Sequence, residues 1–316
     1  RDGVKFTHSY VANSLSGPSR ACMITGKHSH KNGFTNNEHG IFDGSQQTMP
    51  KLMQKAGYQT ALIGKWHLVS EPTGFDFWNI IPGQGDYYNP AFINMDGSRV
   101  TEKGYLTNII TDKAIDWMEH KRDKNRPFIL FVHHKACHRN WLPELKYINE
   151  YEDQTFPLPD TFYDQYEGRT AAQQQQMSIA SDHDMDMVYD VKMYHPDLHT
   201  RLSDSHLGMI GRLDTKDRAR YDHFYDSLAI DFRARNLKGK ELAEFKYQRY
   251  MRDYAKVLKS LDDNVGRTLD YLKEAGLLEN TLVVYTSDQG FYMGEHGWFD
   301  KRCMYEPSFS TPLVMR

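Results

Sequence analysis

The chain has 316 residues, of which 39% are hydrophobic and 13% aromatic, enough to bury a large core. Its formal net charge of −3 and the lack of a long basic run argue against a nucleic-acid-binding protein. No apolar stretch approaches the roughly 20 residues of a membrane-spanning helix, and the 3 cysteines have no metal-type spacing and imply no disulfide framework.

The first part of the chain, to about residue 145, alternates helical and strand patterns. Residues 47–56 predict a helix, and residues 59–63 predict a short buried strand. Residues 108–121 predict a further helix, and residues 128–134 form a continuous apolar strand pattern. This alternation is typical of an α/β domain with a largely parallel sheet.

The second part of the chain begins with a polar stretch, residues 146–245, which predicts an insertion of helices and loops that lies partly on the surface. We therefore interpret residues 1–316 as one domain that carries this insertion. Apolar residues then repeat every three or four positions over 246–272, which predicts an amphipathic helix of about seven turns. Residues 281–286 predict a buried strand that delivers Asp288 at its carboxyl end, where α/β folds bind ligands.

The most informative motif is Ser16-Gly17-Pro18-Ser19-Arg20. Pro18 suits the first position of a helix, and Gly26 suits the left-handed residue after its end. Ser16 is then expected at the mouth of a helix, where free backbone N–H groups favour an anion. The motif alone is weak, because such a pattern occurs by chance in roughly one chain in twenty. Alone it also fits a plain helix N-cap.

Four further segments supply the groups that an anionic ester requires. They are Gly64-Lys65-Trp66-His67, Ala136-Cys137-His138-Arg139, Ser287-Asp288-Gln289-Gly290, and Gly294-Glu295-His296 with Asp300-Lys301. An anionic ester repels nucleophiles, so its site needs fixed positive charge around the ester oxygens. Lysine and histidine side chains supply that charge, and carboxylate and amide oxygens suit a hard cation.

In their order and spacing, these five motifs resemble those of the formylglycine-dependent sulfatases of the alkaline-phosphatase superfamily. The resemblance implies an α/β fold with a largely parallel sheet flanked by helices. It also implies that strands near 59–63, 128–134 and 281–286 are central in one sheet. By the same comparison, the chain lacks the family's first strand and its C-terminal subdomain.

The resemblance implies a role for each motif residue. Oxidation of Ser16 by a sulfatase-maturing radical enzyme yields formylglycine, whose hydrate attacks sulfur, and a serine here is typical of bacterial members. The remaining catalytic residues are then Arg20, Lys65, His67, His138 and Lys301. Among them, Arg20 braces the hydrate, His67 deprotonates it, and His138 is the general acid, with Lys301 as the alternative.

The resemblance further implies calcium as a cofactor, ligated by Asp288 and Gln289. The family's pair of aspartates that completes this site belongs to its first strand, which precedes this chain. Cys137 also stands where the family usually has proline beside its sulfate-contacting histidine.

Within the family, the residues around Ser16 and His138 resemble the bacterial N-acetylglucosamine-6-sulfatase branch. That branch removes 6-O-sulfate from glucosamine units of heparan sulfate, keratan sulfate or mucin glycans. Arg139, Asn140, Trp141 and His296 are the candidate sugar contacts, although Trp141 also fits packing and His296 also fits a structural loop residue. A periplasmic or secreted location follows from the same resemblance.

Two alternatives remain open at this stage. One is a phosphate or phosphonate ester hydrolase of the same superfamily, some members of which share the nucleophile motif. The other is a non-catalytic binder of sulfated glycans in which Ser16 stays unmodified.

Overall fold

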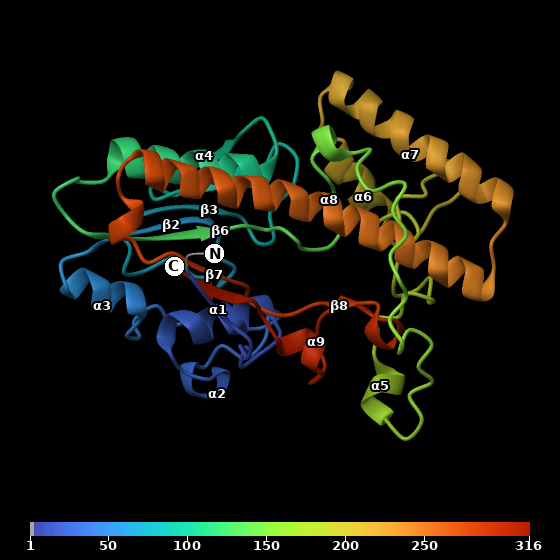
Figure 1. Cartoon of the computed structure of the whole chain (residues 1–316), viewed down its shortest axis with the longest axis horizontal. Helices are drawn as coiled ribbons and strands as arrows, with labels where there is room; N and C mark the ends of the chain where they lie inside the picture. The colour runs from blue at the N-terminus through green and yellow to red at the C-terminus, as the bar shows by residue number, and fades with distance from the viewer. Residues whose placement is uncertain (1–2) are drawn as a thin grey trace.

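A five-stranded sheet forms the centre of the computed structural model, which describes residues 3–316 (Figure 1). Its strand order is β5-β4-β3-β2-β6. The strands are β2 (Gln59–Lys65), β3 (Phe77–Ile81), β4 (Ala91–Asn94), β5 (Arg99–Thr101) and β6 (Phe128–His133). β2 runs parallel to both β3 and β6, whereas β4 and β5 pair antiparallel at one edge. The α/β class predicted from the sequence is confirmed, but the sheet is mixed rather than largely parallel, because the antiparallel strands β4 and β5 extend one edge.

The expectation that residues 281–286 join this sheet is wrong. β7 (Val284–Thr286) lies in a separate antiparallel sheet, flanking β10 (Leu313–Met315), which in turn pairs with β1 (Val4–Phe6). β6 pairs only with β2, and β7 only with β10, so no strand within residues 3–316 bridges the two sheets. β7 is consequently exposed, and β6 is half-buried rather than fully buried.

Helices cover both faces of the large sheet (Figure 1). α4 (Leu106–Asp116), extended by a π turn at Trp117–Lys121, and the C-terminal half of α8 (Gly239–Glu274) lie on one face. α1 (Ser16–Thr25), α2 (Ser29–Asn32) and α3 (Met49–Lys55) lie on the other. α8 begins earlier than the sequence pattern indicated; in its first turns Lys246 pairs with Asp182, and Glu244 accepts a hydrogen bond from the Tyr163 hydroxyl.

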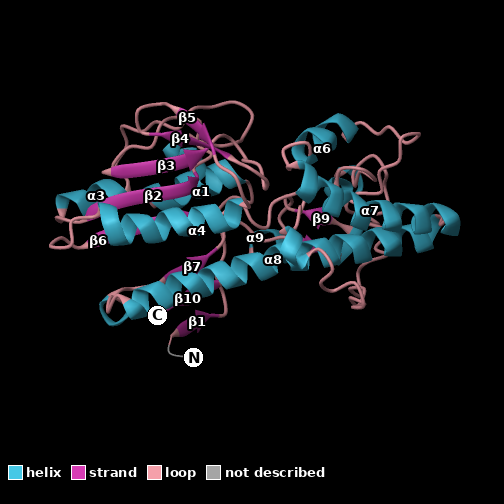
Figure 2. Ribbon diagram, turned by 90° about the horizontal axis from the view of Figure 1, so that it is seen from above, coloured by secondary structure: helices cyan, strands magenta, loops and turns pink. Residues whose placement is uncertain are grey.

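The polar stretch 146–245 contains α5 (Thr170–Gln174), α6 (Ser203–Ile210) and α7 (Thr215–Arg235). Figure 2 shows α6 and α7 beside the N-terminal half of α8, away from the large sheet. A hydrophobic cluster that includes Trp141, Tyr221 and Tyr250 joins them. No helix among residues 3–316 is long and apolar enough to cross a membrane.

A buried ionic group ties this stretch to α8. The Asp253 carboxylate of α8 lies 3.1 Å from Lys192 Nζ, 3.1 Å from Arg249 Nη2 and 3.3 Å from Lys256 Nζ. All four side chains are essentially inaccessible to water. Burial opposes ionisation of Asp253, but the surrounding cations outweigh it and hold its pKa below the ordinary range.

The chain ends with short elements that follow β7. β8 (Tyr292–Met293) pairs with β9 (Phe299–Asp300), and α9 (Glu306–Phe309) precedes β10. Short turns of 3-10 helix lie at Leu145–Tyr147, Leu278–Asn280 and Glu295–Gly297. The loop between β9 and α9 begins with Lys301.

Candidate active site

Ser16 is the first residue of α1 and lies directly against Lys65, the last residue of β2. Lys65 Nζ donates a hydrogen bond to Ser16 Oγ (3.2 Å), and both residues are buried. Pro18 is the third residue of the helix rather than the first. A backbone N–H at the third position also has no acceptor within the helix, so proline is tolerated there. Gly26 ends the helix in the left-handed conformation, as predicted (φ 65°).

Close packing around Ser16 explains the glycine that follows it. A Cβ on Gly17 would lie 2.6 Å from Phe34 Cε1 and 2.8 Å from Asn37 Oδ1. The Gly17 N–H instead donates to Asn37 Oδ1 (3.0 Å). Asn37 therefore fixes the first turn of α1 and occupies one of its N–H groups. Pro18 has no N–H and the Leu15 N–H donates to Asn13 Oδ1 (3.1 Å), so this helix start offers an anion fewer free donors than the sequence predicts.

Arg20 connects α1 to Asp288, the second residue after β7. Arg20 Nε lies 2.9 Å from Asp288 Oδ2, and Arg20 Nη1 donates to Lys65 O (2.7 Å). Burial alone would raise the pKa of Asp288, but the charges of Arg20, Lys65 and Lys301 hold it well below its usual range. The carboxylate is thus ionised and available to a cation at neutral pH.

The carboxyl ends of β2 and β6 approach each other very closely at this edge of the sheet. Gly64 has a φ of 104°, and a Cβ there would lie 2.1 Å from His133 O. Only glycine permits this approach. It brings His133 Nδ1 to 3.0 Å from Lys65 O and 3.1 Å from Arg20 Nη1.

Lys65 and His67 both lie in a positively charged, buried environment. Burial lowers the pKa of Lys65 well below its ordinary value; Asp288 opposes this shift, whereas Arg20 and Lys301 add to it. Burial and the Lys65 charge lower the pKa of His67 to about 3, so its imidazole is neutral. Gln84 Nε2 lies 3.0 Å from His67 Nε2 and donates to it.

His138 lies on the loop after β6, on a turn closed by its own N–H, which donates to Lys135 O (2.9 Å). Its Nδ1 lies 2.6 Å from Arg139 O, so Nδ1 carries the proton and Nε2 carries the lone pair. Burial, followed by the charges of Lys301 and Lys135, lowers the pKa of His138 well below 6.5. The imidazole is neutral in the free protein.

Two of the predicted sugar contacts, Asn140 and Trp141, are buried in the protein interior. Trp141 is fully buried and packs against Tyr250, with ring centroids 4.5 Å apart. Asn140 is 1% exposed, and its carbonyl accepts from the buried Lys192 ammonium (2.8 Å). Neither side chain reaches a ligand in this conformation, because both are used to anchor the loop.

Arg139 is only partly exposed and is held by the polar stretch 146–245. Its Nε donates to Asp190 Oδ1 (2.6 Å), and its Nη2 donates to Asp190 Oδ2 (2.5 Å) and to Asp184 O (3.0 Å). The Asp190 side chain is inaccessible to water. This bidentate pair fixes the loop that carries His138.

Lys301 and His296 lie on the loops around β9. Lys301 is 4% exposed, and its Nζ lies 2.8 Å from Asp300 Oδ1. His296 has a left-handed backbone (φ 59°), and its Nδ1 lies 2.7 Å from Asp164 Oδ2. His296 is thus oriented by a carboxylate, while its ring packs beside Trp298 and Tyr305.

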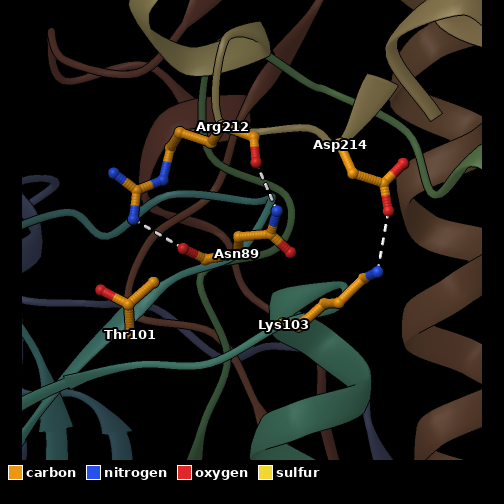
Figure 3. Close-up of a pocket in the computed structure, with 5 residues that line it drawn as sticks. All are labelled: Asn89, Thr101, Lys103, Arg212 and Asp214. Carbon is orange, nitrogen blue, oxygen red and sulfur yellow. Dashed lines mark hydrogen bonds and ion pairs between the residues drawn. The ribbon is translucent and has the colours of Figure 1, made fainter. Parts of the chain in front are cut away.

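Two pockets lie near these elements. One, of about 670 Å³, is lined by residues 10–15, 302–304 and 309, which directly precede Ser16 and directly follow Lys301. The other, of about 480 Å³, is lined by Asn89, Thr101, Lys103, Arg212 and Asp214. In the second pocket, Lys103 pairs with Asp214 and Arg212 donates to Asn89 O (Figure 3), so its cations already have partners.

The residues present fit a calcium ion only in part. Gln289 Oε1 is buried and has no hydrogen-bond partner among residues 3–316, as expected of an amide oxygen that ligates a cation. Asp288 is ionised beside it. However, residues 3–316 contain no cluster of three or more His, Cys, Asp or Glu side chains arranged for a metal. Calcium takes six to eight oxygen ligands, so further ligands are required.

Several residues at this site lacked a sequence signal. Gln84, Lys135 and Asp190 contact or lie beside the motif residues, yet none belongs to the five motifs. Lys135 is separated from His138 by only two residues in the sequence, and that proximity was the one available clue.

The Sulfatase family profile matches residues 1–316, and the chain belongs to the sulfatase family. The chain is 49% identical over 320 residues to an N-acetylglucosamine-6-O-sulfatase of Bacteroides thetaiotaomicron. That alignment covers 100% of this chain and 56% of the relative, so the chain spans little more than half of the relative's length.

Solved structures agree with this assignment. The structure of BT4656 in complex with its substrate D-glucosamine-2-N,6-O-disulfate matches with a TM-score of 0.93 and 49% identity, over 100% of this chain and 64% of that one. A phosphonate monoester hydrolase from Silicibacter pomeroyi matches with a TM-score of 0.62 and 18% identity, over 100% of this chain and 61% of that one. The second match shows a shared fold only.

Proposed function

We propose that the protein containing this chain hydrolyses sulfate monoesters, with 6-O-sulfated glucosamine units of glycans as its substrates. The observation that carries the proposal is the convergence of Ser16, Arg20, Lys65 and Asp288 through direct contacts at one edge of the sheet. Lys301 is close enough for its charge to act on Lys65, and His138 is close enough to be affected by the charges of both lysines. The 49% identity to an N-acetylglucosamine-6-O-sulfatase supports the substrate class.

Ser16 is proposed to be the residue that a maturing radical enzyme oxidises to formylglycine. The position suits an aldehyde hydrate, because Lys65 Nζ donates to the Oγ position and Arg20 lies one turn further along the same helix. One hydroxyl of the hydrate attacks sulfur and the sugar alcohol departs. The other hydroxyl then loses its proton, expels sulfate and regenerates the aldehyde. Neutral His67 is proposed as the base for that second step, once its Nε2, which accepts from Gln84 in the free protein, turns to the hydrate.

The leaving oxygen needs a proton, and we assign its delivery to Lys301 rather than to His138. His138 carries its proton on Nδ1, where Arg139 O accepts it, and its low pKa keeps Nε2 unprotonated. An unprotonated nitrogen is a hydrogen-bond acceptor, not an acid. His138 Nε2 is therefore proposed to orient the hydrate or a substrate hydroxyl.

Asp288 and Gln289 would hold calcium, which supplies positive charge to the sulfate oxygens when bound. The contact between Arg20 and Asp288 orients that carboxylate. A sulfatase of glycans acts where glycans are encountered, so we propose a periplasmic or secreted location.

Matched esters test the proposal. The matured protein is assayed with N-acetylglucosamine 6-sulfate and N-acetylglucosamine 6-phosphate, and with 4-nitrophenyl sulfate, phosphate and phenylphosphonate. A sulfatase prefers each sulfate over its matched phosphorus ester. Preference for the phosphate or phosphonate would assign the protein to the other branch, and binding of the sulfated sugar without any turnover would indicate a glycan-binding protein.

A further inference from the structure

Lys135 is a buried cation beside the candidate active site that the mechanism does not use. It follows β6 directly after His133 and His134, at the same edge of the sheet as Lys65. It is 6% exposed. Its carbonyl accepts from the His138 N–H (2.9 Å), so Lys135 and His138 project from a single turn.

The Lys135 ammonium has no carboxylate partner. Within residues 3–316 its Nζ takes part in no hydrogen bond or ion pair, and its contact is the face of Tyr87, whose ring centroid lies 4.9 Å away. The Tyr87 hydroxyl in turn donates to His138 O (2.7 Å). Tyr87 thus holds the ammonium beside His138 by a cation–π contact without neutralising its charge.

The other cations at the site are already assigned. Arg20 pairs with Asp288 and Lys301 pairs with Asp300. Lys65 Nζ points at Ser16 Oγ, where the reacting sulfate group would be attacked. Lys135 is the remaining buried ammonium beside His138, and an unpaired buried charge is costly until an anion joins it.

We propose that Lys135 binds a second sulfate group of the substrate, carried on the same sugar as the sulfate that reacts. This inference rests on the proposed function and names a determinant of its substrate choice. Burial lowers the pKa of Lys135 to about 7; Lys301 adds to this shift and Asp86 opposes it, so an arriving sulfate would stabilise the charged form. A charge-assisted hydrogen bond of this kind is worth at least tenfold in affinity.

The test compares two substrates that differ at one group: glucosamine 2-N,6-O-disulfate and N-acetylglucosamine 6-sulfate. For Lys135→Met in the matured protein, KM for the disulfate should rise about tenfold or more, while kcat and the KM for the monosulfate stay within about twofold. Lys135→Arg should retain much of the discrimination. Lys103→Met, which removes an exposed lysine paired with Asp214, is the matched control and should change neither substrate.

Equal losses for both substrates, or no loss for either, would overturn the proposal. Calorimetric titration of Ser16→Ala protein with the disulfate provides a readout that needs no turnover, because Lys135→Met in that background should weaken binding by the same factor. Failure of wild-type protein to release sulfate from either sugar would instead refute the proposed function, and the titration would still decide the role of Lys135.

Discussion

Lys65 Nζ donates a hydrogen bond to Ser16 Oγ across 3.2 Å, although 48 residues separate the two in sequence. The contact joins the start of α1 to the end of β2, and both side chains are buried. In the proposed mechanism, the same ammonium contacts the hydrate and the sulfate that it attacks. Each prediction below follows from a contact of this kind.

Ser16→Ala should abolish turnover of every sulfate ester, because alanine has no hydroxyl that can become the aldehyde hydrate. The assay is sulfate release from N-acetylglucosamine 6-sulfate and from 4-nitrophenyl sulfate. Ser19→Ala is the matched control, since Ser19 is equally buried on the same helix and its Oγ has no hydrogen-bond partner among residues 3–316. Substantial turnover by Ser16→Ala would show that another residue is the nucleophile.

Lys301→Met should lower kcat for N-acetylglucosamine 6-sulfate by about 10²–10³, the usual cost of losing one such donor. The loss should be much smaller for 4-nitrophenyl sulfate, because its leaving group departs without a proton. His138→Gln should depress kcat for the two substrates by similar factors, since we assign it no proton transfer to the leaving oxygen. If His138→Gln instead spared 4-nitrophenyl sulfate while Lys301→Met lowered kcat for both substrates equally, His138 would be the acid.

Asp190→Asn should loosen the loop that carries His138. Asparagine is neutral and cannot accept both hydrogen bonds from Arg139, so the variant should lose roughly 2 kcal/mol of stability. Because His138 then loses its position, kcat should fall about tenfold. Asp222→Asn is the control, because it breaks another ion pair of the same polar stretch, with Arg218 within α7. Equal kcat losses in both variants would mean that general destabilisation, rather than His138, explains the effect.

The stability of the fold should depend on pH through His206. Burial, followed by the charges of Lys192 and Arg218, lowers the pKa of this histidine to about 3, below its ordinary 6.5. Unfolding therefore takes up a proton, so stability is complete above about pH 6.5 and falls as the pH drops towards 3. Between pH 7 and pH 5, His206 should account for a loss of roughly 2 kcal/mol.

Urea denaturation at pH 7 and pH 5 measures this loss. His206→Gln should reduce the difference between the two pH values, whereas His30→Gln, a change at an exposed histidine, should leave it intact. An unchanged difference in His206→Gln would assign the pH dependence to other groups.

Calcium should raise the melting temperature of the protein, and Asp288→Asn should reduce that shift. Gln289 Oε1, buried without a partner among residues 3–316, should contribute as well. Differential scanning fluorimetry with calcium and with a chelator measures the effect. An equal calcium shift in wild type and Asp288→Asn would place the ion elsewhere.

Sequence patterns predicted which motif residues converge better than they predicted which strands pair. Ser16, Arg20, Lys65 and Asp288 were predicted from motifs, and the structure brings these four together. Residues 281–286 were placed in the wrong sheet, because an apolar run reveals that a strand exists but not which strand it pairs with.

The predicted sugar contacts show a second limit of the sequence. Asn140 and Trp141 follow His138 and have side chains that suit a sugar, yet they anchor the loop in the core. Lys135 and Asp190 were missed for a related reason. Their importance lies in contacts with Tyr87 and Arg139, which only tertiary packing creates.

The mass of the peptide containing Ser16, measured on active protein from a host that matures sulfatases, tests the central claim most directly. If Ser16 is the precursor of the nucleophile, active protein contains a peptide two hydrogens lighter than the serine form, the mass expected of formylglycine. The fraction of this lighter peptide should rise in proportion to the specific activity of the preparation. A fully active preparation in which this peptide retains the mass of unmodified serine would contradict it.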